Sequence, residues 1–115
     1  MLEMSQNEIK NAFIDLGKFL SQFSLEGNTK QKAIKNNDPH FEAFEQLITL
    51  SQSHNGWFTP ENVYFSVESW ANALTAENLT KWLSNYDFSM IKPKTVGLIL
   101  AVNILLVGFY DFFSV

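Results

Sequence analysis

The sequence predicts a mainly α-helical fold of about four helices, followed by a strand, a turn and the start of another helix. Apolar residues recur at helical spacing along residues 6–83, and helix-start signals stand at residues 38, 59 and 75. The chain then changes character, because residues 95–115 are almost wholly apolar and Asp111 is their only charged residue. We therefore expect a helical segment over residues 1–92 and a second part over residues 93–115.

Composition and charge exclude several classes of protein. The chain has 115 residues, enough for one domain, and 46% of them are hydrophobic. Its net charge is −4 and its 8 basic residues are all lysine. We expect no nucleic-acid partner, because arginine is the usual reader of phosphates and base edges. The lack of cysteine excludes disulfides, thiolate metal sites and a cysteine nucleophile within the chain. His40 and His54 hold no metal without carboxylates, so no metal site is expected.

The first predicted helix covers residues 6–24. Its apolar residues follow one another at steps of four and three and form one face: Ile9, Phe13, Leu16, Leu20 and Phe23. The sequence at residues 26–28 (EGN) then stops the helix. Residues 28–37 are polar and carry three lysines, which fits a solvated loop or a short frayed helix, with a basic binding patch as the alternative.

The second predicted helix opens at Asp38-Pro39, with Asp38 as the N-cap and Pro39 in the first turn, and ends before Asn55-Gly56. The residues expected on its inward face are Phe41, Phe44, Leu47, Ile48 and Leu50. Trp57 and Phe58 follow on the connector and could cover a pocket. Packing into the core is the expectation for both, because loop aromatics beside helices are usually packed.

The third and fourth helices are predicted from matching start signals. Thr59-Pro60-Glu61 supplies a cap, a first-turn proline and an acid at the positive helix end, and Thr75 caps the next helix in the same way. The fourth helix is expected to end near residues 85–87. We expect the helices to pack on one another mainly through Phe13, Leu20, Phe44, Leu47, Val67, Trp70 and Trp82.

The apolar segment 95–115 has two physical interpretations. It is long enough to cross a bilayer, with Lys92 and Lys94 as a positive flank, which would make it a C-terminal membrane anchor; Asn103 and Asp111 argue against this. Alternatively, residues 95–101 form a buried strand of the kind found in parallel sheets, residues 102–104 form a turn and the rest begins a helix. A single strand leaves its backbone groups unpaired on both sides, so this interpretation needs a sheet supplied from elsewhere.

Two stretches carry a resemblance to a known family. Residues 54–63 (HNGWFTPENV) and 94–101 (KTVGLILA) resemble the beginning of LuxC-type acyl-CoA reductases, which belong to the aldehyde dehydrogenase superfamily. The resemblance covers roughly residues 38–115. It implies that the chain is the N-terminal portion of such an enzyme: a helical segment and the first strand and helix start of an incomplete α/β nucleotide-binding domain. The complete enzymes are several times longer than this chain and reduce a fatty acyl thioester to an aldehyde, using NADPH and an acyl-cysteine intermediate.

The resemblance also assigns site residues. Asn103 matches the asparagine that donates a hydrogen bond to the oxyanion of the thiohemiacetal. A donor held in a fixed position suits this role, because it stabilises charge that develops only in the transition state. Ala101, Val102 and Ile104 match the residues that line the approach to the cofactor. The chain departs from the family pattern in carrying Val102 where the family has glycine and Leu105 where it has proline. These changes affect the expected contact with NADPH.

The resemblance and the composition together give the functional expectation. Because the chain has no cysteine, it lacks the family's nucleophile, and we expect it to be inactive alone and to bind no NADPH by itself. Its expected partners are the remaining C-terminal portion of the enzyme and, in the complete enzyme only, acyl-CoA. For such a reductase portion we expect a cytoplasmic location. The alternatives are a small helical interaction module, and a tail-anchored membrane protein held through residues 95–115.

Overall fold

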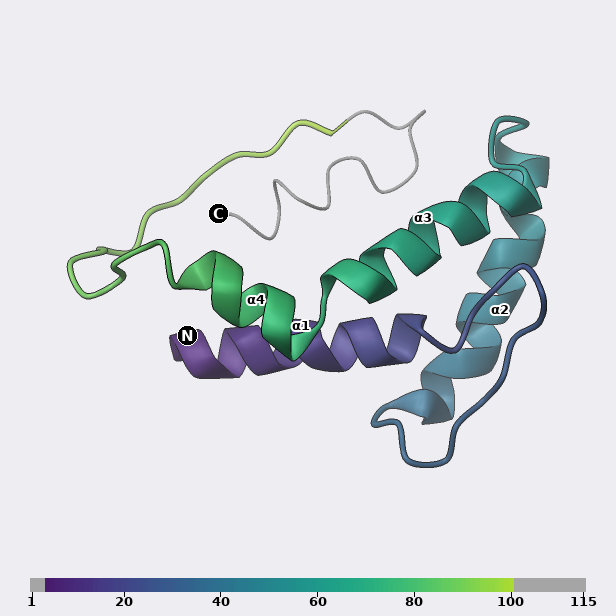
Figure 1. Cartoon of the computed structure of the whole chain (residues 1–115). Helices are drawn as coiled ribbons and strands as arrows, with labels where there is room; N and C mark the ends of the chain where they lie inside the picture. The colour runs from purple at the N-terminus through teal and green to yellow at the C-terminus, as the bar shows by residue number, and fades with distance from the viewer. Residues whose placement is uncertain (1–3, 101–115) are drawn as a thin grey trace.

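The helical part of the prediction is confirmed. A computed structural model describes residues 4–100 of the chain, which contain four helices and no strand (Figure 1). The helices are α1 (Gln6–Leu20), α2 (Asn37–His54), α3 (Pro60–Ala73) and α4 (Ala76–Leu83). α3 and α4 lie along α1, and α2 runs steeply across the end of that pair (Figure 1).

Hydroxyl side chains set the starts of three helices. Ser5 accepts from the backbone N–H of Glu8, and the Glu8 carboxylate accepts from the backbone N–H of Ser5, forming a capping box at α1. Thr59 and Thr75 accept from the backbone N–H groups three residues ahead and cap α3 and α4, which confirms both predicted caps. These bonds occupy N–H groups that have no partner inside the helix.

The predicted cap of α2 is wrong. Asn36 occupies the N-cap position, with φ 65°, and Asp38 inside the first turn has the non-helical angles φ −90° and ψ 116°. The residue before a proline is disfavoured in the helical region, so regular helix begins only at Pro39. The Asp38 carboxylate accepts a hydrogen bond from the Lys30 ammonium group instead of capping the helix.

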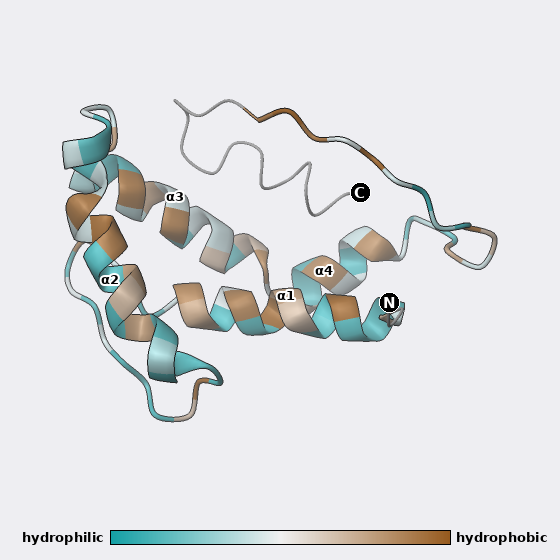
Figure 2. Ribbon diagram, turned by 180° about the vertical axis from the view of Figure 1, so that it is seen from behind, coloured by the Kyte–Doolittle hydropathy of each residue, from teal (hydrophilic) through white to brown (hydrophobic). Residues whose placement is uncertain are grey.

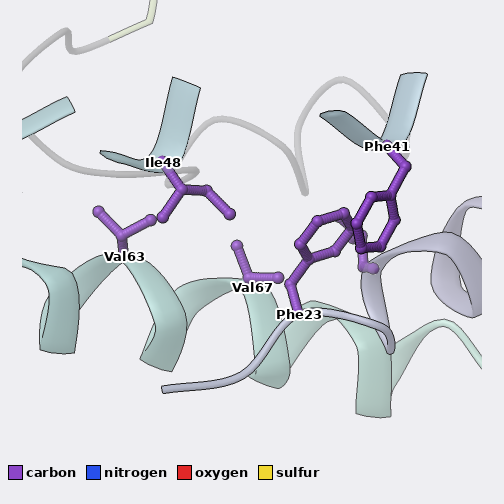
Figure 3. Packing of buried hydrophobic residues seen from close by; sticks show 6 residues of the cluster. Phe23, Phe41, Ile48, Val63 and Val67 are labelled. Atoms are coloured by element: carbon purple, nitrogen blue, oxygen red, sulfur yellow. The ribbon is translucent and has the colours of Figure 1, made fainter. Parts of the chain in front are cut away.

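The core lies where α2 and the end of α1 meet α3. Its fully buried members are Leu20, Phe23, Phe41, Ile48, Val63 and Val67. Figure 3 shows Ile48 of α2 above Val63 and Val67 of α3, while Phe23 lies beside Phe41. The rings of Phe23 and Phe41 are stacked at 4.8 Å between centroids, and Phe44 meets Phe23 edge-on at the same separation. Aromatic packing therefore joins the turn after α1 to the first turns of α2.

Several residues of the predicted inward helix faces lie elsewhere than expected. Phe23 is 1% exposed, but it lies in the turn after α1 rather than on the helix. Ile9, Leu47 and Leu50 are exposed, which corrects their predicted burial. α2 is covered along one face only, through Phe41 and Ile48, so apolar residues on its other faces stay in solvent.

The chain beyond α4 runs outside the helical core. The predicted strand at residues 95–101 is described as far as residue 100, and residues 91–100 form neither helix nor strand. In Figure 2 the part of this stretch nearest residue 100 is mostly brown, the colour of hydrophobic residues, and the stretch runs apart from the helices. Within the described part of the chain, no helix is both long enough and apolar enough to cross a membrane.

Candidate functional site

The residues that the resemblance assigns to chemistry lie outside the described residues. These are Ala101, Val102, Asn103 and Ile104, at the start of residues 101–115. The oxyanion role of Asn103 and the cofactor contacts therefore stay predictions. The structure does describe the segment that leads to them, residues 90–100, which we call the extension.

The extension follows three aromatic side chains that contact one another in a row. The ring of Tyr86 meets Trp82 of α4 edge-on at 5.8 Å and lies 6.2 Å from the ring of Phe88. The Asp87 carboxylate accepts the backbone N–H of Ser89 at 2.9 Å, and this hydrogen bond lowers the pKa of that carboxyl. These contacts hold residues 82–89 to the end of α4.

The extension itself is apolar and exposed. Its exposed large side chains are Met90, Ile91, Val96, Leu98, Ile99 and Leu100. Its two charged residues, Lys92 and Lys94, are also exposed. Six neighbouring apolar side chains in water are unusual for a soluble monomer, in which large exposed apolar patches mark contact sites. The arrangement can present backbone N–H and C=O groups and apolar side chains to a partner at the same time.

An open cavity lies between α1 and the start of α2. It has a volume of about 560 Å³, an apolar floor that includes Leu16 and Phe19, and a polar rim. On the rim, the Asp15 carboxylate stands 3.8 Å from the Lys35 ammonium group. Hydrogen bonds from Ser5, chiefly from its backbone N–H, lower the pKa of the rim residue Glu8. The two carboxylates on the rim, those of Glu8 and Asp15, thus already interact with neighbouring groups. The residues that line the cavity include no nucleophile paired with a base.

A buried polar network holds the loop between α1 and α2. The side-chain amides of Gln22 and Asn37 bond each other in both directions, at 2.6 and 2.7 Å. Gln22 also accepts from the backbone N–H of Gln31, and Asn37 donates to the Gln31 carbonyl. Because both amides are buried, this network fixes the loop, and its role is structural.

Lys30 holds the same loop to α2 by hydrogen bonds at the protein surface. Its ammonium group donates to Asp38 at 2.5 Å and to Glu42 at 2.9 Å, and it lies 5.8 Å from the centre of the Phe41 ring. The hydrogen bonds to Asp38 and Glu42 raise the pKa of Lys30, and the bond from Lys30 lowers the pKa of Glu42. The alternative of a basic binding patch in residues 28–37 is weakened, because acids of α2 partly neutralise its lysines.

Neither histidine belongs to a metal-binding group among residues 4–100. No group of three or more His, Cys, Asp or Glu side chains in that range could hold a metal ion. His40 lines the open cavity between α1 and α2, and His54 lies at the end of α2.

Trp57 is also exposed where the sequence predicted packing into the core. The expected packing is confirmed for Phe58, which packs against the core, but the Trp57 side chain is 78% exposed. A sequence signal was present, because residues 46–60 carry no Asp, Glu, Lys or Arg. Fully buried interface cores are depleted of charge and enriched in tryptophan.

Comparison with protein-family models, with curated proteins and with solved structures gave no match for this chain.

Proposed function

We propose that the chain is the N-terminal portion of a LuxC-type, NADPH-dependent acyl-CoA reductase of the cytoplasm, and that it is inactive as an isolated polypeptide. The observation that carries the proposal is the exposed extension. Its apolar residues 95–100 have the composition of a central strand of a parallel sheet, yet no described residue pairs with them. A buried strand separated from its sheet would have these properties.

The helical core is compatible with such a role. Residues 5–84 contain all the fully buried hydrophobic residues of the described chain, and the extension contributes none. The helices can therefore form a supporting unit while the extension belongs to a different core. In the proposed enzyme, the α4 end and its aromatic contacts set the point from which the extension leaves the helices.

The proposed reaction takes a fatty acyl thioester, NADPH and a proton to an aldehyde, a free thiol and NADP⁺. NADPH supplies the hydride in the complete enzyme. The resemblance assigns this chain one reacting-centre contact, the Asn103 side-chain amide, which would donate to the oxyanion and stabilise charge that develops in the transition state. The cysteine that carries the acyl group must come from the remainder of the enzyme, because this chain has none.

A second candidate is a helical interaction module without catalysis. The exposed tryptophan and the uncharged stretch around it favour this alternative, because both are typical of protein interfaces. The two candidates differ in one requirement: a module needs only its binding surface, whereas the reductase portion needs a complementary polypeptide that carries cysteine and the rest of the nucleotide-binding domain.

The deciding experiment is complementation. The 115-residue chain is expressed alone and together with the remaining C-terminal portion of a LuxC-type reductase, and NADPH oxidation with a fatty acyl-CoA is measured. We expect no activity from either polypeptide alone and activity from the pair. Asn103→Ala should then lower kcat by about 10²–10³-fold, whereas the control Asn72→Ala, an exposed position on α3, should not.

Two results would contradict the proposal. Thioester reduction by the purified chain alone would overturn the predicted inactivity. A stable pair with no activity would favour the interaction module. Sequencing beyond the Val115 codon and comparing the native mass with the 13.2 kDa of these residues gives an independent check.

A further inference from the structure

Residues 46–60 contain no Asp, Glu, Lys or Arg and expose three large apolar side chains. Leu47 is 65% exposed, Leu50 52% and Trp57 78%. The stretch runs between Glu45 and Glu61, so it is bounded by charge but contains none. We call it the uncharged surface. Its exposed apolar residues come from the second half of α2 and from the connector that follows.

The leucines of this surface form a separate face of α2. Leu47 and Leu50 are three residues apart and lie on one side of the helix, whereas the buried Phe41 and Ile48 face the core. A helix that only covers a core has one apolar face. Among the described residues, nothing covers the second apolar face of α2. The covering of the core therefore does not explain why this face is apolar.

The backbone at Trp57 is fixed although its side chain is exposed. The backbone N–H of Trp57 donates to the Asn55 side-chain oxygen at 3.0 Å, and its carbonyl accepts from the Asn62 side-chain amide at 3.0 Å. The backbone N–H of Phe58 donates to the Asn55 carbonyl at 2.9 Å, and Phe58 packs on the core. The indole is thus displayed on a braced turn, which lowers the conformational entropy that binding would cost.

The chemistry of this surface points to an uncharged protein partner. A lipid headgroup or a nucleic acid needs cations, and residues 46–60 offer none. A strongly charged protein surface would lose hydration without gaining an ion pair. A rigid tryptophan with aliphatic neighbours suits an apolar pocket in a partner protein.

The size of the surface argues against a free-standing dimer. Three partly exposed side chains offer a few hundred Å², whereas a stable complex buries about 800 Å² on each partner. A contact of this size is effective when the partner is already held nearby, because attachment raises its effective concentration. The extension can provide that attachment. In Figures 1 and 2, the extension and the connector after α2 both lie on the side of α3 that is turned away from α1.

We propose that the uncharged surface, centred on Trp57, is the site where the helical unit docks on the portion of the reductase that takes up the extension. This inference rests on the proposed function and adds the contact surface to it. The partner site is an uncharged apolar pocket that receives the Trp57 indole, with Leu47 and Leu50 at its edge. The extension and the uncharged surface then hold the same partner at two points.

The experiment measures complex formation by the full chain with the complementary C-terminal portion, as a dissociation constant from titration. Trp57→Ser and Leu50→Ser change the uncharged surface. Phe65→Ser is the matched control, because Phe65 is 74% exposed on α3 between Glu61 and Glu68 and belongs to a charged face. Circular dichroism and the Tm of each variant check that the helices are intact.

We expect Trp57→Ser to weaken the complex at least about tenfold, Leu50→Ser to weaken it less, and Phe65→Ser to leave it unchanged. If the wild-type chain forms the complex and Trp57→Ser binds as well as Phe65→Ser, the docking site is wrong and the proposed function stands. If the wild-type chain forms no complex, both are overturned. If the chain alone forms a dimer that Trp57→Ser dissociates, the occupant is a second copy and the assignment to the reductase is overturned.

Discussion

Gly17 of α1 lies directly against Leu74, the C-cap residue that follows α3. A Cβ atom added at Gly17 would stand 2.8 Å from the Leu74 Cβ atom and closer still to the Leu74 carbonyl oxygen. The two helices therefore approach at a point where only glycine fits, and both residues are buried. This contact joins α1 to the turn between α3 and α4.

Gly17→Ala should destabilise the protein by about 1–3 kcal/mol, because the added methyl group meets backbone atoms that cannot move aside freely. The loss outweighs the helix propensity that alanine gains over glycine, which is about 1 kcal/mol. The measurement is the free energy of unfolding in urea. Gly56→Ala is the control, since an added Cβ there meets nothing within 4 Å and should leave the stability unchanged.

Asn37→Leu should cost about 1–3 kcal/mol, because it leaves the buried Gln22 amide without its reciprocal partner. Asn36→Leu is an unsuitable control because Asn36 has a positive φ. Asn11→Leu, at an exposed position on α1, serves better. Equal stability of Asn37→Leu and wild type would show that the amide pair contributes nothing to the fold.

Thr75→Ala should destabilise the protein by about 1 kcal/mol, because the hydroxyl that accepts the Asn78 N–H is lost. Thr80 offers the comparison. It lies inside the same helix, where alanine is the better helix former, so Thr80→Ala should be neutral or slightly stabilising. Thermal unfolding distinguishes the two, and a Tm that falls equally in both variants would speak against the cap.

Glu42→Gln should lower the stability at neutral pH and have less effect in acid. The Lys30 hydrogen bond lowers the pKa of Glu42 below its usual 4.5 in the folded protein, so the carboxylate contributes stability above that value. The contribution disappears as the pH falls through the lower, folded pKa. The pKa of Lys30 is raised above 10.5, so its contribution is present below that value and is lost as the pH rises through the folded pKa.

The test compares wild type and Glu42→Gln by urea unfolding at several pH values. The difference between them should shrink toward zero below the folded pKa of Glu42. Glu68→Gln is the control, because Glu68 forms no ion pair with the described residues. A difference that stays constant from neutral to acid pH would mean that the Lys30 contact does not stabilise the fold.

Ile99→Ser should leave the Tm of the helical core unchanged, because Ile99 is fully exposed and belongs to no described core. It should also reduce self-association of the isolated chain, since it removes part of an exposed apolar segment. Light scattering measures the second effect. Val67→Ser, by contrast, lies in the buried cluster and should lower the Tm strongly.

Helix starts could be predicted from the sequence where the signal is local. The hydroxyls of Thr59 and Thr75 act on N–H groups three residues away, so nothing distant is needed to predict them. The predicted start of α2 is wrong for two reasons: Pro39 disfavours helical backbone angles at Asp38, and Lys30 binds the Asp38 carboxylate. Local capping rules cannot include such a competitor.

The choice of faces could be predicted only in part. Phe41 and Leu47 look alike in a helical pattern, but Phe41 stacks on Phe23 in the turn after α1, whereas Leu47 is exposed. The sequence shows the spacing of apolar residues along one helix, but it does not show the angle at which the next helix crosses it. The resemblance assigns site roles to residues 101–104 only within a sheet, and residues 4–100 contain no strand.

The pairing of α1 with α3, rather than with its neighbour in sequence, has a consequence during synthesis. Leu74 follows the end of α1 by more than fifty residues, and a ribosome adds about 5–20 residues per second, so α1 waits roughly 3–10 s for its partner. A helix of 15 residues is marginal in water until it packs. The nascent chain therefore presents Phe13 and Leu16 to the cell for seconds, and chaperone binding to this first helix would act before α3 can pack on it.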